Sequence, residues 1–271
     1  MEHSSKTGRL SHSRATDKNS LRARRKREAR KRLLILLSIT FLLGFLAGFL
    51  IGSRKESTLN FIMTPASGQP SDTSTPSYSN LPWNLTLVNF ENTLPENFAP
   101  EKLAEVDNGY EADSRIAEAA KKMIADAYAE NVRIIALSAY RDYEYQTELF
   151  ENKVQRLQQE KGYSVDKARE EAKTVVAYPG TSEHQLGLAL DLVDARHTKL
   201  DESQENTTAY KWLYEHCAEY GFIVRYPNGK TNITGIIYEP WHFRYVGEEA
   251  AKVIMEEGLT LEEYLEKYYT E

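Results

Sequence analysis

The residues best suited to chemistry lie between Ser182 and Asp191. Here His184 and Asp191 stand seven residues apart among mostly small and apolar residues. Imidazole nitrogen and carboxylate oxygen both bind Zn²⁺, and a catalytic zinc site commonly has three protein ligands and one position for water. The third ligand must come from elsewhere, and His242 is the best candidate. An isolated His/Asp pair is otherwise more typical of a loop closed by the histidine and a strand ended by the aspartate.

Two more polar side chains would complete a hydrolytic site around such a metal. Glu239 stands three residues before His242, so it can take a proton from water and pass it to a leaving amine. Arg141 offers fixed positive charge for a substrate carboxylate or a developing oxyanion. Zinc itself would activate the water and polarise the carbonyl. Taken alone, Arg141 is more typical of a surface ion pair.

The elements that must position these residues are strands connected by loops and helices. Apolar and β-branched runs predict strands, and helical spacing of apolar residues with capping signals predicts helices. The expected strands are 132–137, 188–193, 222–226 and 241–245, with 85–88 as a short strand or extended segment; the expected helices are 114–130, 143–160, 164–175, 207–219, 248–257 and 261–269. This order predicts an α+β fold with a small, mainly antiparallel sheet flanked by helices. The three polar segments each follow or overlap a strand, so we expect them to converge at one edge of the sheet.

The charge of the chain is sharply divided. Residues 1–32 hold 12 Lys/Arg and 3 Asp/Glu, a net charge of +9, so the rest carries −15 of the chain's total of −6. The basic segment directly precedes an uncharged apolar run at 33–52, which favours a membrane topology signal over nucleic-acid binding. No nucleic-acid partner is therefore expected.

The apolar run at 33–52 is long enough to cross a bilayer. Its twenty residues would span about 30 Å as a helix. A cleaved signal peptide is the alternative, but its apolar region is usually about 7–15 residues and ends at a small-x-small site. We therefore expect four parts: a basic cytoplasmic tail (1–32), a single transmembrane anchor (33–52), a disordered Ser/Thr/Pro-rich linker (53–80) and an extracellular domain (81–271).

Three motifs in this order closely resemble the zinc D-alanyl-D-alanine carboxypeptidases of the VanY type, relatives of the VanX D,D-dipeptidases in peptidase family M15. The pattern S-x-H-x-x-G-x-A-x-D is complete from Ser182 to Asp191, S-[GA]-Y-R stands at 138–141 with Gln146 downstream, and E-P-W-H stands at 239–242. The similarity extends from about Trp83 to the C-terminus.

The resemblance implies a hedgehog/DD-peptidase-like fold and a role for each motif residue. It implies zinc bound by His184, Asp191 and His242, with Glu239 as general base. It further implies that the substrate's C-terminal carboxylate or scissile carbonyl is held by Arg141, Ser182 and Gln146, with Ser138 and Tyr140 beside them. Tyr140 has the alternative of a core ring.

The expected function is a membrane-anchored zinc carboxypeptidase that removes the terminal D-alanine of peptidoglycan stem peptides. One alternative is an L,D-carboxypeptidase that acts on tetrapeptide stems with the same metal site. Another is a non-catalytic zinc-containing binding module, such as the distantly related hedgehog signalling domain. No obligate protein partner is evident, and the single cysteine, Cys217, allows no disulfide within the chain and is expected to pack as a small apolar residue.

Overall fold

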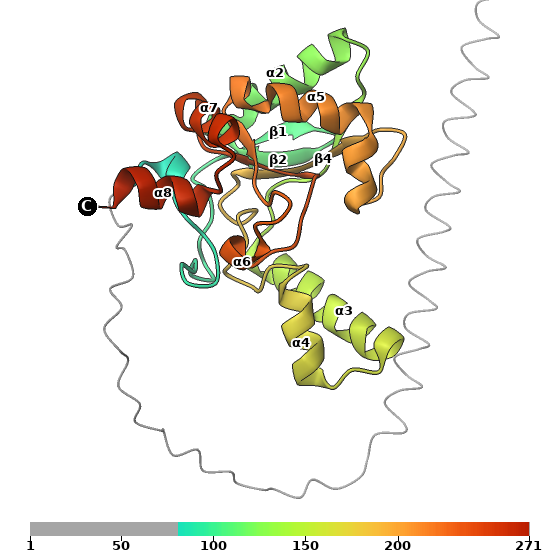
Figure 1. Cartoon of the computed structure of the whole chain (residues 1–271). Helices are drawn as coiled ribbons and strands as arrows, with labels where there is room; N and C mark the ends of the chain where they lie inside the picture. The colour runs from blue at the N-terminus through green and yellow to red at the C-terminus, as the bar shows by residue number, and fades with distance from the viewer. Residues whose placement is uncertain (1–80, 271) are drawn as a thin grey trace, which may run out of the picture. The chain divides into compact units, whose positions relative to one another are not determined.

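A computed structural model describes residues 81–270, which form an α+β arrangement with two antiparallel sheets (Figure 1). The tail, anchor and linker expected at 1–32, 33–52 and 53–80 lie outside the described residues. Within 81–270, every helix is too short or too polar to cross a membrane.

The larger sheet has four strands, which confirm the four main strand predictions. Their spatial order is β3-β4-β6-β5, and every neighbouring pair is antiparallel. The bounds are β3 (Ile134–Ser138), β4 (Ala189–Asp194), β5 (Phe222–Val224) and β6 (His242–Tyr245). All six residues of β4 are buried, as expected of a central strand covered on both faces.

The smaller sheet is a hairpin that is absent from the expected elements. It consists of β1 (Leu103–Asp107) and β2 (Tyr110–Asp113). Asn108 and Gly109 connect the strands, and both have positive φ, at 51° and 81°. Two positive φ values are what a tight type I′ hairpin turn requires, and Asn-Gly is the dipeptide that adopts it most readily.

Of the two alternatives for 85–88, the short strand is wrong, and residues 86–88 belong to no helix or strand. A 3₁₀ helix, η1 (Trp83–Leu85), begins this region, and no strand pairing follows in it. Leu85, Leu87 and Val88 are nevertheless buried. Their apolar side chains therefore serve packing, which a strand-like sequence pattern does not distinguish from pairing in a sheet.

The expected helices are all present, with small differences at their ends. They are α2 (Ser114–Ala129), α3 (Tyr143–Lys161), α4 (Val165–Lys173), α5 (Thr208–His216), α7 (Glu248–Glu257) and α8 (Leu261–Tyr269), with short helices η2 (Glu202–Asn206), η3 (Cys217–Tyr220) and α6 (Thr231–Thr234) in the connections. Ser164 caps α4 as expected, and Thr260 forms the expected capping box with Glu263.

The helices fall into two groups, one that packs on the larger sheet (the body) and one that extends away from it as a hairpin. Figure 1 shows α2, α5 and α7 together on one side of the strands, and α3 and α4 extending away from the other side as a hairpin. The main core packs α2 and α5 against the sheet, around side chains such as Ile116, Leu190 and Phe243. Buried Cys217 belongs to this core, as expected.

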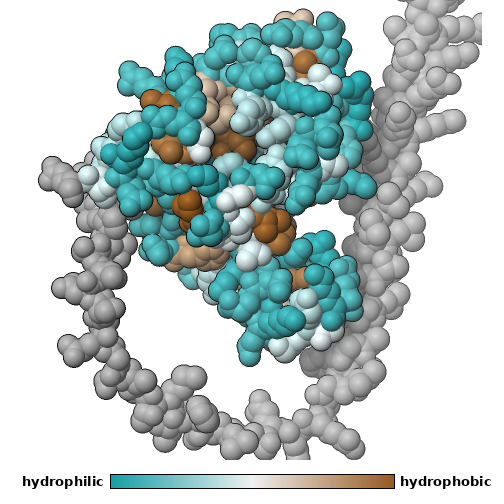
Figure 2. All heavy atoms as spheres, in the orientation of Figure 1, coloured by the Kyte–Doolittle hydropathy of each residue, from teal (hydrophilic) through white to brown (hydrophobic). Residues whose placement is uncertain are grey.

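The α3–α4 hairpin has a small apolar cluster of its own. It consists of Phe150, Val154, Leu157, Ala168 and Ala172. Figure 2 shows a largely hydrophilic surface on this face, with a notch between the hairpin and the body. The hairpin is therefore a separately packed arm attached beside the sheet.

Candidate functional site

The register of the sheet brings two of the expected metal ligands together. Asp191 of β4 and His242 of β6 are directly opposite partners in the antiparallel ladder, so their side chains leave the sheet on the same face. His184 comes from the tight turn that precedes β4, where backbone hydrogen bonds run from Gln185 to Ser182 and from Gly187 to His184. Gly187 has a positive φ of 70°, and a Cβ there would lie 2.9 Å from the backbone nitrogen of Asp113. Only glycine fits that turn without displacing the hairpin.

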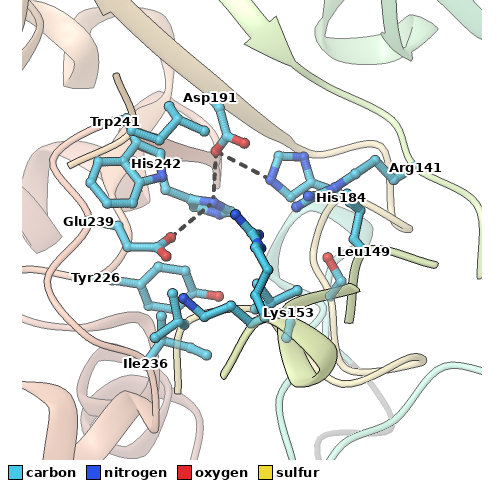
Figure 3. A pocket seen from close by; sticks show the side chains of 16 residues that line it. Arg141, Leu149, Lys153, His184, Asp191, Tyr226, Ile236, Glu239, Trp241 and His242 are labelled. Atoms are coloured by element: carbon cyan, nitrogen blue, oxygen red, sulfur yellow. Dashed lines mark ion pairs between the residues drawn. The ribbon is translucent and has the colours of Figure 1, made fainter. Parts of the chain in front are cut away.

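The donor atoms of the three residues converge on one point (Figure 3). Asp191 Oδ1 lies 3.4 Å from His184 Nε2 and 3.2 Å from His242 Nδ1, and all three donors lie within 4.8 Å of one another. A tetrahedral zinc ion with bonds of 2.0–2.1 Å holds its donors about 3.3–3.4 Å apart. All three residues are buried, and neither Asp191 Oδ1 nor His184 Nε2 has a hydrogen-bond partner among the described residues. Buried polar atoms rarely stay unpaired, so the residues fit a zinc ion.

His184 is held in the form that a metal requires. Its Nδ1 lies 2.6 Å from the carbonyl oxygen of Ala139, and since a carbonyl can only accept, Nδ1 carries the proton and Nε2 is left with its lone pair. Burial, followed by the positive charge of Arg141, lowers the pKa of His184 to about 4. The imidazole is therefore neutral at physiological pH.

His242 is held from behind by a buried carboxylate. Its Nε2 lies 3.6 Å from Glu183 Oε2, on the side of the ring away from Asp191. Glu183 in turn accepts hydrogen bonds of 2.7 Å from both Arg225 Nε and Arg244 Nη1. Burial alone would raise the pKa of Glu183, but the two guanidinium groups hold it well below its usual range. A charged Glu183 favours a proton on Nε2 of His242, which leaves Nδ1 free for a metal.

Glu239 lies beside the donor set and is not part of it. Its Oε2 is 3.8 Å from His242 Nδ1, and its backbone nitrogen donates to the carbonyl of Tyr226. Burial raises the pKa of Glu239 to about 8, and the nearby charge of Asp191 adds to the effect, against His242 and Arg141. A carboxyl group with a pKa near the working pH is suited to both accepting and returning a proton.

The donor set lies in a cavity of about 420 Å³ between the sheet and the α3–α4 hairpin. Six of the predicted site residues line it: Arg141, Ser182, His184, Asp191, Glu239 and His242. The Nε atom of Arg141 is buried without a hydrogen-bond partner among residues 81–270. An N–H group that is already buried and unpaired can donate to a carboxylate ligand at little further cost in desolvation.

Three other predicted residues lie next to the cavity wall without lining it. Gln146 is fully buried, and its amide nitrogen donates to the carbonyl of Ala177 at 2.6 Å. Ser138 pairs with Asp191 in the β3–β4 ladder, and the backbone nitrogen of Tyr140 donates to Glu111. In this geometry they support the residues that line the cavity, and their assignment to substrate stays a prediction.

Several cavity residues do not belong to any motif quoted above. They are Leu149, Lys153 and Arg156 of α3, Val175 to Ala177 after α4, and Leu200, Tyr226 and Ile236. The sequence predicted only a helix over 143–160, so the contribution of α3 to the cavity was missed. Glu183 was also missed, because nothing in the adjacent residues shows that it is buried against two arginines that are distant in the sequence.

The chain matches one family and several solved proteins. The family model of VanY, D-alanyl-D-alanine carboxypeptidase, matches residues 110–248. A D-alanyl-D-alanine carboxypeptidase of Enterococcus faecalis is 46% identical over 184 residues, which are 68% of this chain and 66% of the relative. The chain thus spans about two thirds of that relative's length.

Two solved structures share both fold and sequence with this chain. A mutant of the vancomycin resistance D,D-pentapeptidase VanY in complex with Zn(II) is 43% identical, with a TM-score of 0.61, over 68% of this chain and 99% of that one. The LD-carboxypeptidase LdcB is 40% identical, with a TM-score of 0.59, over 67% of this chain and 85% of that one.

Proposed function

This chain belongs to the VanY family of D-alanyl-D-alanine carboxypeptidases, and from that premise we propose that it is a zinc enzyme that removes the C-terminal D-alanine of peptidoglycan stem peptides. The observation that carries the proposal is the set of three buried donors at His184, Asp191 and His242. Their spacing of 3.2–3.4 Å around Asp191 Oδ1 suits tetrahedral zinc, the metal found with a solved VanY.

Each remaining residue has a role that its position supports. Bound zinc would lower the pKa of a water molecule and polarise the scissile carbonyl. Glu239 is placed to take a proton from the attacking water and to deliver it to the amine of the leaving D-alanine. Arg141, whose buried Nε has no hydrogen-bond partner within 81–270, binds the C-terminal carboxylate, and Ser182 in the same cavity donates its hydroxyl to the substrate.

The test is release of D-alanine by residues 81–271. We expect release from a pentapeptide stem by the zinc-loaded protein, and loss of release with EDTA that zinc restores. An intact pentapeptide after incubation with zinc-loaded, folded protein would contradict the proposal. A non-catalytic zinc module would give that same result, but it gives no reason for Glu239 to be buried beside the donor set.

One neighbour favours a second candidate activity. LdcB, an LD-carboxypeptidase, resembles this chain almost as closely as VanY does. An L,D-carboxypeptidase would use the same metal and base on tetrapeptide stems. Mass spectrometry of products from matched tetra- and pentapeptide stems distinguishes the two: we expect the pentapeptide to be shortened by one residue and the tetrapeptide to persist.

We also propose that residues 33–52 anchor the enzyme to the cell membrane, with the N-terminus in the cytoplasm and the domain outside. The division of charge and the apolar run in the sequence support this placement. Full-length protein should sediment with membranes, and deletion of 33–52 should release it. Continued sedimentation of the deletion variant would contradict the anchor.

A further inference from the structure

The wall of the cavity opposite the metal ligands is a basic stripe on α3. Leu149, Lys153 and Arg156 all line the cavity, and their spacing of four and three residues places them on one face of the helix. The neighbouring face, with Phe150, Val154 and Leu157, packs against α4. The stripe is therefore turned towards the substrate space by the same packing that holds the hairpin together. Figure 3 shows Lys153 extending from the helix across the cavity, towards the side on which Tyr226 and Glu239 lie.

The two cations of the stripe have no acidic partner. Among residues 81–270, no carboxylate oxygen lies within ion-pair distance of either, whereas Arg169 on the same hairpin pairs with Glu151 at 2.7 Å. Burial, and then the positive charges of Arg156 and Lys161, lower the pKa of Lys153, with Glu160 acting in the opposite direction. A half-buried ammonium group among other cations is a position that an anion would stabilise.

Nothing in the proposed chemistry at the scissile bond uses these cations. Arg141 already supplies the positive charge for the terminal carboxylate. It immediately precedes the α3 N-cap, Asp142. Lys153 lies ten residues into α3 from Tyr143, which at 1.5 Å per residue is about 15 Å along the helix axis. An extended peptide covers that distance in about four residues, and fewer when side chains contribute reach.

We propose that Lys153 and Arg156 form a second anion subsite, which binds a free carboxylate two to four residues before the C-terminal residue of the substrate. The inference rests on the proposed carboxypeptidase function and adds the class of substrate to it. The preferred substrates are acidic peptides in which this upstream carboxylate is not amidated. Amidation would replace the anion by a neutral group and remove the charge-assisted hydrogen bonds.

The experiment compares peptides that differ only in this charge. The substrates are six-residue N-acetylated peptides that end in D-Ala-D-Ala. Each peptide carries a single Glu, placed two, three or four residues before the C-terminal residue, and each has a partner peptide with Gln in its place. With the zinc-loaded enzyme, we expect kcat/KM for the best Glu peptide to exceed that for its Gln partner by about tenfold to a hundredfold. In Lys153→Met and Arg156→Met this ratio should fall towards one.

The control is Lys167→Met on α4, an exposed lysine of the same hairpin that does not line the cavity. It should keep the Glu/Gln ratio of the unaltered enzyme. Equal kcat/KM for Glu and Gln peptides at every position would overturn the subsite and leave the carboxypeptidase function standing. A preference that survives in both Lys153→Met and Arg156→Met would overturn it as well. If folded, zinc-loaded protein released D-alanine from no peptide at all, the carboxypeptidase function would fail first, and the subsite with it.

Discussion

Two buried polar clusters lie on opposite sides of the His242 ring, and they differ in how their atoms are paired. The cluster behind the ring contains Glu183, Arg225, Arg244 and Glu262, joined by hydrogen bonds of 2.7–2.9 Å. The cluster in front contains the two other metal ligands and Glu239, and Asp191 Oδ1 and His184 Nε2 there have no hydrogen-bond partner among the described residues. Behind the ring, the atoms without such a partner are Glu183 Oε2 and His242 Nε2, which face each other at 3.6 Å as an ion pair.

The difference indicates what each cluster is for. Buried charges are tolerated when they are paired and hydrogen-bonded, so the rear cluster holds the strands and the ring in place. Buried polar atoms without a hydrogen-bond partner cost stability, so they persist where a bound ligand supplies the missing interaction. His242 contacts both clusters, with Nδ1 in front and Nε2 behind. Substitutions in front should therefore reduce mainly activity, and substitutions behind should reduce mainly the free energy of unfolding.

The largest effect is expected from Glu239→Gln in the front cluster. The amide cannot accept the proton of the attacking water, so kcat should fall by about 10²- to 10⁴-fold. The bound zinc content and the free energy of unfolding should stay close to those of the unaltered protein. Steady-state kinetics, metal analysis and urea unfolding measure the three quantities. Turnover within a few fold of the original would show that Glu239 is not the base.

The next effect is loss of stability in Glu183→Gln, in the rear cluster. Removal of this charge leaves two buried guanidinium groups with less compensation, and breaking a buried pair costs about 3–5 kcal/mol. Zinc affinity of the folded variant should also fall by about 10–100-fold, because Glu183 no longer orients His242.

Glu262→Gln is the matched control for that substitution. Glu262 pairs with Arg225 but has no contact with His242. It should therefore reduce the free energy of unfolding and leave zinc affinity near its original value. Equal losses of zinc affinity in both variants would contradict the orienting role of Glu183.

Zinc should stabilise the folded protein through the front cluster. A ligand present at a hundred times its dissociation constant, and bound only by the folded state, adds about 2.7 kcal/mol. EDTA should remove this gain, and Asp191→Asn should show little of it. Thermal unfolding with and without zinc provides the measurement. A gain of full size in Asp191→Asn would place the ion elsewhere.

The smallest expected effect is a loss of the free energy of unfolding at low pH. The pKa of Glu183 is lower in the folded protein than its usual value, so its contribution to stability is present above about pH 4.5 and is lost as the pH falls through the folded value. Between about pH 5 and 2.5, the unaltered protein should lose about 1–2 kcal/mol more than Glu183→Gln loses. Parallel pH curves for the two proteins would show that folding does not lower the pKa of Glu183.

Much of the fold could be predicted from local pattern. The buried run that became β4 and the capping box at Thr260 carry their structure in adjacent residues, and both predictions are confirmed. The β1–β2 hairpin was missed because its strands are only five and four residues long and show no regular alternation of buried and exposed positions, so the signal lies in Asn108-Gly109 alone. A strand was considered at 85–88 because apolar residues occur both in strands and in irregular segments that pack against a core.

The site divides in the same way. His184, Asp191 and His242 were predicted because they stand in motifs, and the structure brings them together. Lys153 and Glu183 were not, since their surroundings depend on how α3 and the strands pack over long separations in sequence. No local pattern shows that a lysine in a charged helix faces a cavity. Nor does any show that a glutamate between two motif residues is paired with two arginines.

The opposition of Asp191 and His242 across β4 and β6 has a consequence for folding. Because side chains alternate between the faces of a sheet, a slip of one residue in this ladder would turn one of the two ligands to the other face. Only one alignment of the strands creates the metal site. Metal uptake during refolding would therefore report when these strands have found their native alignment, separately from the formation of helices or of a collapsed core.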